Sequence, residues 1–338
     1  MTSLTGAVTL FAGSPTGASG TTNGTGSAAL FFTPDGITSD GTNLYVADQN
    51  NNQIRKIVIS TGAVTLLAGS PTGVAGTTNA TGTAALFNNP MGITTDGTNL
   101  YVTESVNNDI RKIVISTGAV TLFAGSPTQT AGMTNGTGSG ALFSNPLGIT
   151  TDGTNLYVAD YNNNQIRQIV IATGVTSLLA GSTAGTAGMT NGTGTGASFR
   201  NPRDVATDGT NLYVTDQNNN QIRKIVIATG ATSLLAGSTA GTGGMVNGTG
   251  TGATFNMPLG LATDNTNLYI SDYGNNQIRK LVISTGAVSL LAGSATGAVG
   301  MANGTGSAAS FNGPAGLCLV NGALYVGDFW NNEVRQIK

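Results

Sequence analysis

Six places along the chain pair an acidic residue with an arginine seven positions later. Each acid ends an apolar run such as NLYVAD, and each arginine lies in a run such as QIRKI. A carboxylate and a guanidinium at this spacing can meet across a hairpin as a charge-assisted ion pair. Because all six repeat one pattern, we predict structural salt bridges, with a ring of ligand sites as the alternative. The pairs are Asp48/Arg55, Glu104/Arg111, Asp160/Arg167, Asp216/Arg223, Asp272/Arg279 and Asp328/Arg335.

A second group of charges occurs in one segment. The stretch FRNPRDV, residues 199–205, contains Arg200, Arg203 and Asp204, whereas the five equivalent stretches read FFTPDGI, FNNPMGI, FSNPLGI, FNMPLGL and FNGPAGL. Only 8% of the residues are charged, so this cluster departs from the repeat. The charges can pair locally, Arg203 with Asp204 or Arg200 with a neighbouring loop acid, or they can face a ligand.

Aromatic residues also break the repeat, at the position after each second-run acid. Two copies have tyrosine there, and the last copy has phenylalanine followed by the only tryptophan of the chain. Rings stack on sugars and peptides, guanidinium groups pair with anions, and asparagine amides donate and accept hydrogen bonds. We therefore predict a ligand site in one sector of one face, with scattered surface variation as the alternative. The candidate residues are Tyr161, Arg200, Arg203, Asp204, Tyr273, Phe329 and Trp330.

The composition excludes several kinds of chemistry. The sequence has no histidine and one cysteine, Cys318, which nearly excludes zinc sites and histidine-based triads and rules out an internal disulfide. The net charge of −2 provides no basic field for a nucleic acid. No apolar run approaches the roughly 18 residues of a membrane span, and the start MTSLTGAVTL lacks the features of a signal peptide. We expect no nucleic-acid partner and no membrane insertion.

The loop DxNNN offers oxygen atoms at alternating positions, which suits a hard cation such as calcium. However, each loop has one acid, which is expected to face its arginine, and none has the EF-hand pattern. We favour asparagine-rich turns over calcium sites and expect no cofactor and no metal. Six Asn-Gly/Ala-Thr triplets, from Asn23 to Asn303, are also interpreted as turns rather than glycosylation sites.

A repeat of 56 residues must position these groups, because the glycine of [FL]AGS recurs at that interval from Gly13 to Gly293. Each unit has four short β-rich runs separated by turn signals, which predicts a four-stranded antiparallel meander. The chain starts with a fourth run, GAVTLFAGS, and stops after a third, NNEVRQIK. We predict one all-β domain, residues 1–338, forming a six-bladed β-propeller of four-stranded antiparallel blades. Its N-terminal strand, residues 6–13, should complete the blade of residues 311–338 and close the ring.

The succession PxG[IL]xxD, NLYV[AST]D and NxIR[KQ]I resembles the NHL repeat across all six units. This family includes protein-binding, RNA-binding and catalytic propellers, so the resemblance implies the fold more strongly than a function. The long unit is similar to those of bacterial surface and secreted proteins, which implies an extracellular or cell-surface location.

We predict a non-catalytic binding or interaction module that recognises a protein, peptide or carbohydrate on its loop-rich face, and we expect a monomer. A calcium- or metal-dependent lactonase-like or lyase-like propeller enzyme is the first alternative. The resemblance implies that such enzymes need histidines or an inward glutamate, which this sequence does not offer. The second alternative is an engineered or recently amplified repeat scaffold with no specific ligand.

Overall fold

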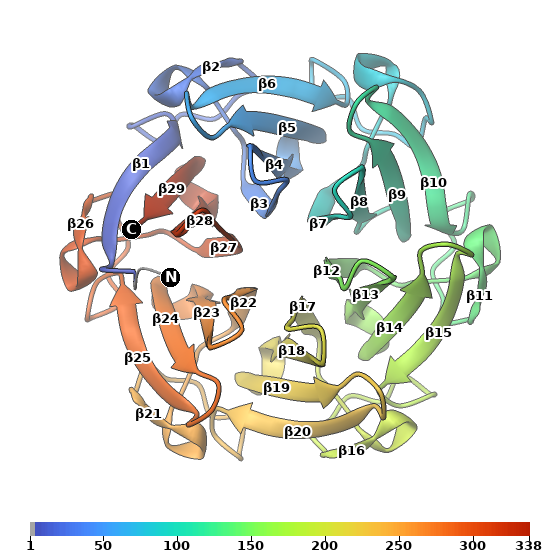
Figure 1. The fold of residues 1–338 in the computed structure, drawn as a ribbon, viewed down its shortest axis with the longest axis vertical. Coiled ribbons are helices and arrows are strands. Elements are labelled where there is room, and N and C mark those ends of the chain that lie inside the picture. The colour runs from blue at the N-terminus through green and yellow to red at the C-terminus, as the bar shows by residue number, and fades with distance from the viewer. Residues whose placement is uncertain (1–3) are drawn as a thin grey trace.

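The computed structural model describes residues 4–338, so residues 1–3 of the predicted domain lie outside the described range. Six antiparallel sheets surround a central axis, and the first strand of each lies innermost (Figure 1). In the first blade, the order from the axis outwards is β3 (Pro34–Ser39), β4 (Asn43–Asp48), β5 (Gln53–Val58) and β6 (Ala63–Ala68). The structure therefore confirms the predicted all-β, six-bladed propeller.

The next four blades repeat this order. They consist of β7 (Pro90–Thr95), β8 (Asn99–Glu104), β9 (Asp109–Val114) and β10 (Ala119–Gly125); β12 (Pro146–Thr151), β13 (Asn155–Asp160), β14 (Gln165–Val170) and β15 (Val175–Ala180); β17 (Pro202–Thr207), β18 (Asn211–Asp216), β19 (Gln221–Val226) and β20 (Ala231–Ala236); and β22 (Pro258–Thr263), β23 (Asn267–Asp272), β24 (Gln277–Val282) and β25 (Ala287–Ala292).

The sixth blade closes the ring, as predicted. It combines β27 (Pro314–Val320), β28 (Ala323–Asp328) and β29 (Glu333–Ile337) with the N-terminal strand β1 (Ala7–Gly13). Strand β1 pairs antiparallel with β29, from Val8 opposite Ile337 to Gly13 opposite Glu333. The two ends of the chain thus meet in one sheet (Figure 1).

Each outer strand gains an additional partner that the sequence did not predict. A two-residue strand from the preceding connection pairs with the outer edge of five blades, and a bridge between Thr81 and Ala119 takes this place in the second blade. Exposed strand edges are sites of unwanted pairing, so these short segments protect the rim of the ring. They are β2 (Gly24–Thr25), β11 (Gly136–Thr137), β16 (Gly192–Thr193), β21 (Gly248–Thr249) and β26 (Gly304–Thr305).

Short 3₁₀ helices occur in two kinds of connection. Those in the long connections between blades are η1 (Gly26–Ala28), η3 (Gly82–Ala84), η4 (Gly138–Gly140), η6 (Gly194–Gly196), η8 (Gly250–Gly252) and η10 (Gly306–Ala308). Those after the second strand are η2 (Gln49–Asn51), η5 (Tyr161–Asn163), η7 (Gln217–Asn219), η9 (Tyr273–Asn275) and η11 (Phe329–Asn331).

The hydrophobic core is divided among the interfaces between blades. Between the first and second blades, Tyr45 and Ile54 pack with Leu100 and Val102, and all four are buried. Burying one such side chain contributes about 1.5–3 kcal/mol. Each blade therefore depends on its neighbours for a core.

All six predicted acid–arginine pairs are formed within their blades, as the repeated spacing predicted. In each pair, the Nη1 group of the arginine lies within hydrogen-bond distance of a carboxylate oxygen of the acid. The distances are 2.9 Å for Arg55 and Asp48, 2.7 Å for Arg111 and Glu104, 2.9 Å for Arg167 and Asp160, 3.0 Å for Arg223 and Asp216, 2.8 Å for Arg279 and Asp272, and 3.1 Å for Arg335 and Asp328.

The arginines also hold the long connections, which the sequence did not predict. In the first blade, Arg55 Nη2 donates to Asn23 Oδ1 at 2.9 Å, and the guanidinium lies 5.2 Å from the centre of the Phe31 ring. The asparagine of each Asn-Gly/Ala-Thr turn is thus a partner of the arginine as well as part of a turn. The same bond joins Arg111 to Asn79, Arg167 to Asn135, Arg223 to Asn191, Arg279 to Asn247 and Arg335 to Asn303.

Candidate functional site

A depression of about 340 Å³ lies at the end of the ring where the first strands begin. We call it the face basin. Three sets of residues line it: an inner set one residue after the proline that begins each first strand, an outer set one residue after each second-strand acid, and a third set, Asn89, Asn145 and Met257, one residue before the proline. The inner residues are Asp35, Met91, Leu147, Arg203 and Leu259, and the outer residues are Ser105, Tyr161, Gln217, Tyr273 and Phe329.

Strand pairing explains why the inner and outer positions meet. Within a blade the proline is opposite the acid, as Pro202 is opposite Asp216 in the fourth blade. The residues that follow, Arg203 and Gln217, therefore emerge at the same end of the hairpin. Because the six blades repeat this register, their variable residues gather around one end of the axis.

An ion pair crosses the floor of the basin. Arg203 on β17 of the fourth blade donates a hydrogen bond to Asp35 on β3 of the first, and both side chains are buried. The two residues are 168 positions apart, which is three repeats and places them on opposite sides of the ring. Burial raises the pKa of Asp35, and the Arg203 guanidinium opposes the shift. Arg203 thus pairs with Asp35, not with Asp204 as the local alternative supposed.

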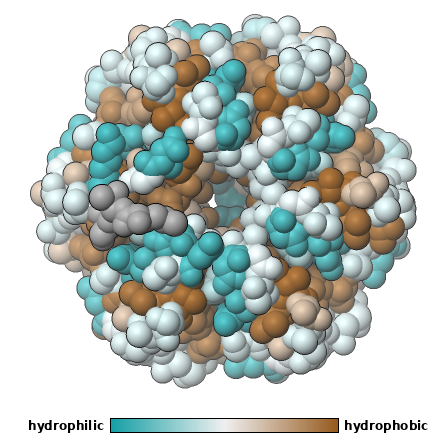
Figure 2. All heavy atoms as spheres, viewed as in Figure 1, coloured by the Kyte–Doolittle hydropathy of each residue, from teal (hydrophilic) through white to brown (hydrophobic). Residues whose placement is uncertain are grey.

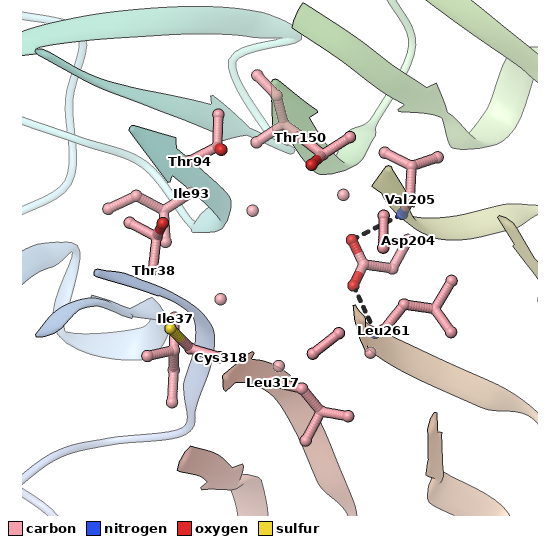
Figure 3. A pocket seen from close by; sticks show the side chains of 18 of the residues that line it. Ile37, Thr38, Ile93, Thr94, Thr150, Asp204, Val205, Leu261, Leu317 and Cys318 are labelled. Carbon is pink, nitrogen blue, oxygen red and sulfur yellow. Dashed lines mark hydrogen bonds between the residues drawn. The ribbon is translucent and has the colours of Figure 1, made fainter. Parts of the chain in front are cut away.

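Asp204 lies in the channel below the basin rather than in the predicted site. Its Oδ1 accepts a hydrogen bond from the backbone N–H of Val205 at 2.8 Å, and its Oδ2 accepts one from Leu261 at 2.9 Å (Figure 3). Burial raises the pKa of Asp204 to about 7, against the effect of these hydrogen bonds and of Arg203.

The channel has a volume of about 200 Å³ and follows the axis, where the face seen in Figure 2 is hollowed at its centre. Thr38, Thr94 and Thr150 line one side, and Cys318 is also part of the wall (Figure 3). Burial raises the pKa of the Cys318 thiol to about 12, which keeps the thiol neutral.

Five of the six first strands have a glycine at the place of Asp204, where neighbouring blades come closest to the axis. A methyl group on Gly92 would overlap the carbonyl oxygen of Leu147 in the next blade. A methyl group on Gly148 would overlap Asp204 itself. The glycines therefore permit the close backbone contact that keeps the channel narrow.

The aromatic candidates do gather at the basin. Tyr161, Tyr273 and Phe329 line it, and Trp330 adjoins them on the rim with 53% of its surface exposed. Burial raises the pKa of Tyr161, while Arg203 opposes the shift, so the phenol lies within the field of the floor ion pair.

Arg200 is the candidate that the structure places elsewhere on the surface. Its side chain is exposed and is absent from the basin lining, and its backbone N–H donates to Asp216 Oδ1 at 2.7 Å. The structure thus brings together Tyr161, Arg203, Tyr273 and Phe329, with Trp330 beside them. Asp35 completes the site and was missed, although its offset of 168 residues from Arg203 was a usable signal.

The six repeated ion pairs lie outside both the basin and the channel. Their side chains line neither space, and their guanidinium and carboxylate groups are buried inside the blades. A ring of ligand sites, the alternative interpretation of these pairs, is therefore wrong, because a ligand at the surface would not reach the charges. The arginines concerned, each at most 1% exposed, are Arg55, Arg111, Arg167, Arg223, Arg279 and Arg335.

The oxygens of the loop acids face donors of the protein. Asp48 Oδ1 accepts from Phe32 N at 2.7 Å, and Oδ2 accepts from Asn51 at 2.8 Å as well as from Arg55. Among residues 4–338, no group of three or more His, Cys, Asp or Glu residues is placed to hold a metal ion. Within the same range, no helix is long and apolar enough to cross a membrane.

Comparison with known families and proteins identifies the repeat. Residues 311–337 match the NHL repeat. The chain is 31% identical to the chloroplastic Protein SUPPRESSOR OF QUENCHING 1 of Arabidopsis thaliana, over 80% of this chain and 27% of that protein. It is 27% identical to human NHL repeat-containing protein 2, over 80% of this chain and 42% of that protein. The chain thus spans less than half the length of these relatives.

Solved structures share the architecture. An auxiliary nutrient binding protein from Bacteroides thetaiotaomicron superposes with a TM-score of 0.73 at 17% identity, over 98% of this chain and 76% of that chain. Virginiamycin B lyase from Staphylococcus aureus superposes with a TM-score of 0.55 at 16% identity, over 90% of this chain and 94% of that chain. At these identities the likeness shows the fold alone.

Proposed function

We propose that this six-bladed β-propeller, of which residues 311–337 match the NHL repeat, is a non-catalytic binding module whose ligand occupies the face basin. One observation carries the proposal: the basin is where the sequence departs most from its own repeat. The six buried ion pairs recur in every blade and stabilise the architecture. The residues at the basin differ from blade to blade, so they are available for recognition.

The size and lining of the basin support this proposal. Its volume of about 340 Å³ falls in the range of small-ligand pockets, which extends from about 300 to 1,000 Å³. Tyr161, Tyr273 and Phe329 provide ring surfaces, while Gln217 and Ser105 provide polar groups. A few polar groups among apolar walls are typical of sites that bind sugars, peptides or small parts of a protein surface.

The residues at the axis support binding rather than catalysis. The sequence has no histidine, and the two carboxylates of the channel wall are already engaged: Asp204 accepts two backbone hydrogen bonds, and Asp35 accepts one from Arg203. A metal-dependent enzyme is the alternative class, because virginiamycin B lyase shares the fold. Melting curves with calcium and with EDTA separate the two classes, since a bound ion raises the melting temperature by mass action.

We also propose that the protein acts as a monomer outside the cell or at its surface. The outer edges of the blades are covered by short strands, and in the second blade by a bridge, which removes a common route to association. One structural neighbour is called an auxiliary nutrient binding protein, and we extend a binding role of that kind to this chain.

Glycan and peptide arrays probed with three proteins test the basin. The wild type should bind a subset of probes, and Tyr161→Ala should lose that binding because it removes one wall. Arg200→Ala is the matched control, since Arg200 belongs to the same segment as Arg203 but lies outside the basin. Equal binding by all three proteins, or no binding by the wild type, would overturn the proposal.

A further inference from the structure

An exposed indole stands at the junction of the fifth and sixth blades. Trp330 is the only tryptophan of the chain, and its Nε1–H donates to the hydroxyl of Tyr273 at 2.8 Å. The Phe329 ring meets the indole edge-to-face, with centroids 4.8 Å apart and planes at 87°. We call Trp330 and Tyr273 the aromatic platform. A ring held on two sides loses little conformational entropy when a ligand covers it.

Gly313 shows that the platform is a built feature rather than a chance contact. A Cβ atom on Gly313 would lie 2.6 Å from Trp330 Cδ1 and 2.8 Å from Tyr273 Cε2. The backbone there has a φ of 65°, a conformation that favours glycine. Yet the other five blades adopt the same conformation with larger residues, so the backbone alone does not demand glycine here. Those residues are Thr33, Asn89, Asn145, Asn201 and Met257.

Glycine at this one position therefore makes room for the two rings. The indole and the phenol occupy the space that a side chain fills in the other blades. The packing of Trp330 against Tyr273 thus depends on the absence of a side chain at position 313.

The platform continues the wall of the face basin. Tyr273 and Phe329 line the basin, and Trp330 stands just outside it with half of its surface exposed. A ligand that fills the basin and extends beyond it over the fifth and sixth blades would reach the indole. The platform therefore fits the second unit of an extended ligand better than a single small molecule.

The chemistry of the platform favours a neutral sugar ring. Tyr273 accepts the indole N–H, which leaves its own O–H free to donate beside the ring. An apolar ring face with a hydrogen-bond donor at its edge matches a pyranose, which has an apolar C–H face and a rim of hydroxyl groups. An apolar aromatic side chain would not use this donor. The charges at the basin floor, Arg203 and Asp35, balance each other, so they do not require a charged ligand.

We propose that the aromatic platform is a stacking subsite for a neutral pyranose unit of an oligosaccharide whose adjoining unit occupies the face basin. This inference rests on the proposed binding function. It specifies the ligand class and adds a subsite beyond the basin.

The only tryptophan makes a direct test feasible. Wild-type protein is titrated with cellohexaose, xylohexaose, mannohexaose and chitohexaose, and the tryptophan emission and acrylamide quenching are recorded alongside calorimetry. At least one sugar should shift the emission of Trp330 to shorter wavelength and reduce quenching by about twofold, because stacking covers one face of a half-exposed ring.

Three variants locate the effect. Trp330→Ala should weaken the binding of that sugar about tenfold by calorimetry, the equivalent of one aromatic contact. Gly313→Asn, which installs the residue of three other blades, should also weaken binding while leaving the melting temperature near that of the wild type. Val106→Ala should have no effect. It is the matched control, because Val106 occupies the position of Trp330 in the second blade and is 54% exposed.

The possible failures are distinguishable. If a sugar binds by calorimetry but leaves Trp330 fluorescence and the Trp330→Ala affinity unchanged, the platform inference is wrong and the basin proposal stands. If only phenylalanine-containing peptides protect Trp330 from quenching, the platform is a peptide site and the sugar inference is wrong. If no sugar or peptide binds the wild type by either method, both proposals fail.

Discussion

The ion pair across the axis should be far more costly to break than to replace. Removing one partner of a buried pair leaves an uncompensated charge, which costs about 3–5 kcal/mol, whereas replacing both partners by apolar residues is often neutral. The repeat itself provides the replacements, because the inner positions of other blades hold Met91 and Leu147. We therefore consider Asp35→Met, Arg203→Leu and the double variant.

Urea unfolding of the wild type, the two single variants and the double variant forms a double-mutant cycle. Each single variant should lose about 3 kcal/mol of unfolding free energy, and the double variant should lie within about 1 kcal/mol of the wild type. The sum of the single losses should thus exceed the loss in the double variant by several kcal/mol. Additive losses would refute the interpretation of Arg203 and Asp35 as one buried unit.

The pH dependence of stability tests the same interpretation independently. Burial already raises the pKa of Asp35, and Arg203→Leu removes the guanidinium that opposes this shift. A carboxyl whose folded-state pKa is raised contributes stability below its unfolded pKa of about 3.9 and loses it as the pH rises through the folded value. Arg203→Leu should therefore be less stable at pH 8 than at pH 5, relative to the wild type. A constant difference would show that Asp35 is not left charged and buried.

Four further substitutions test the architecture. Burial raises the pKa of Glu333 to about 7, so Glu333→Gln should increase the unfolding free energy in urea by about 1–3 kcal/mol at pH 8 and change it little at pH 4. Gln277→Glu, at the equivalent position of the fifth blade, should lower the unfolding free energy at pH 8 and change it little at pH 4. Equal increases at both pH values for Glu333→Gln would contradict this. Gly92→Ala should lower the unfolding free energy by about 1–3 kcal/mol, because the added methyl group overlaps the next blade. An unchanged melting temperature would show that the blades can move apart without cost. Asp204→Gly should gain unfolding free energy relative to the wild type as the pH rises from 5 to 8, because it removes a carboxyl with a pKa of about 7. A difference in unfolding free energy that does not depend on pH would be evidence against that ionisation.

Most of the fold was predictable because each unit repeats the same local signals. The apolar runs recur in all six units and the Asp-Gly-Thr-Asn turn recurs in four of them, so an ambiguous strand in one unit is corrected by its counterparts in the others. The two-residue outer strands were not predictable in this way. Gly24–Thr25 and its counterparts have no apolar alternation, and only the proximity of the next outer strand makes them pair.

The sequence predicted one partner of each structural arginine, the acid, but not the other, the asparagine. Asp48 and Arg55 are seven residues apart, so a hairpin model places them together. The other partner of Arg55, Asn23, is 32 residues away, and its role depends on how the long connection packs back on the blade. The sequence alone indicated a turn at Asn23, which is only part of its role.

The different positions of Arg203 and Asp204 depend on the geometry of strand β17. Arg203 and Asp204 are neighbours on β17, and successive side chains of a strand point to opposite sides. Arg203 lines both the basin and the channel, whereas Asp204 lines the channel alone. The distance of 168 residues that separates Arg203 from Asp35 becomes short only when the ring closes, so a local interpretation of the charges could not find the pair.

The two halves of the face basin differ in their side chains. Arg203 and Asp35 lie on opposite blades, so their ion pair divides the floor into two apolar halves. Leu147 of the third blade lies on one side, and Leu259 of the fifth blade lies on the other. The fifth and sixth blades also provide Tyr273, Phe329 and Trp330, whereas Tyr161 is the one aromatic residue of the basin on the other half. A propeller of identical units would have two equivalent halves, whereas here a few substitutions at equivalent positions give the two halves different surfaces.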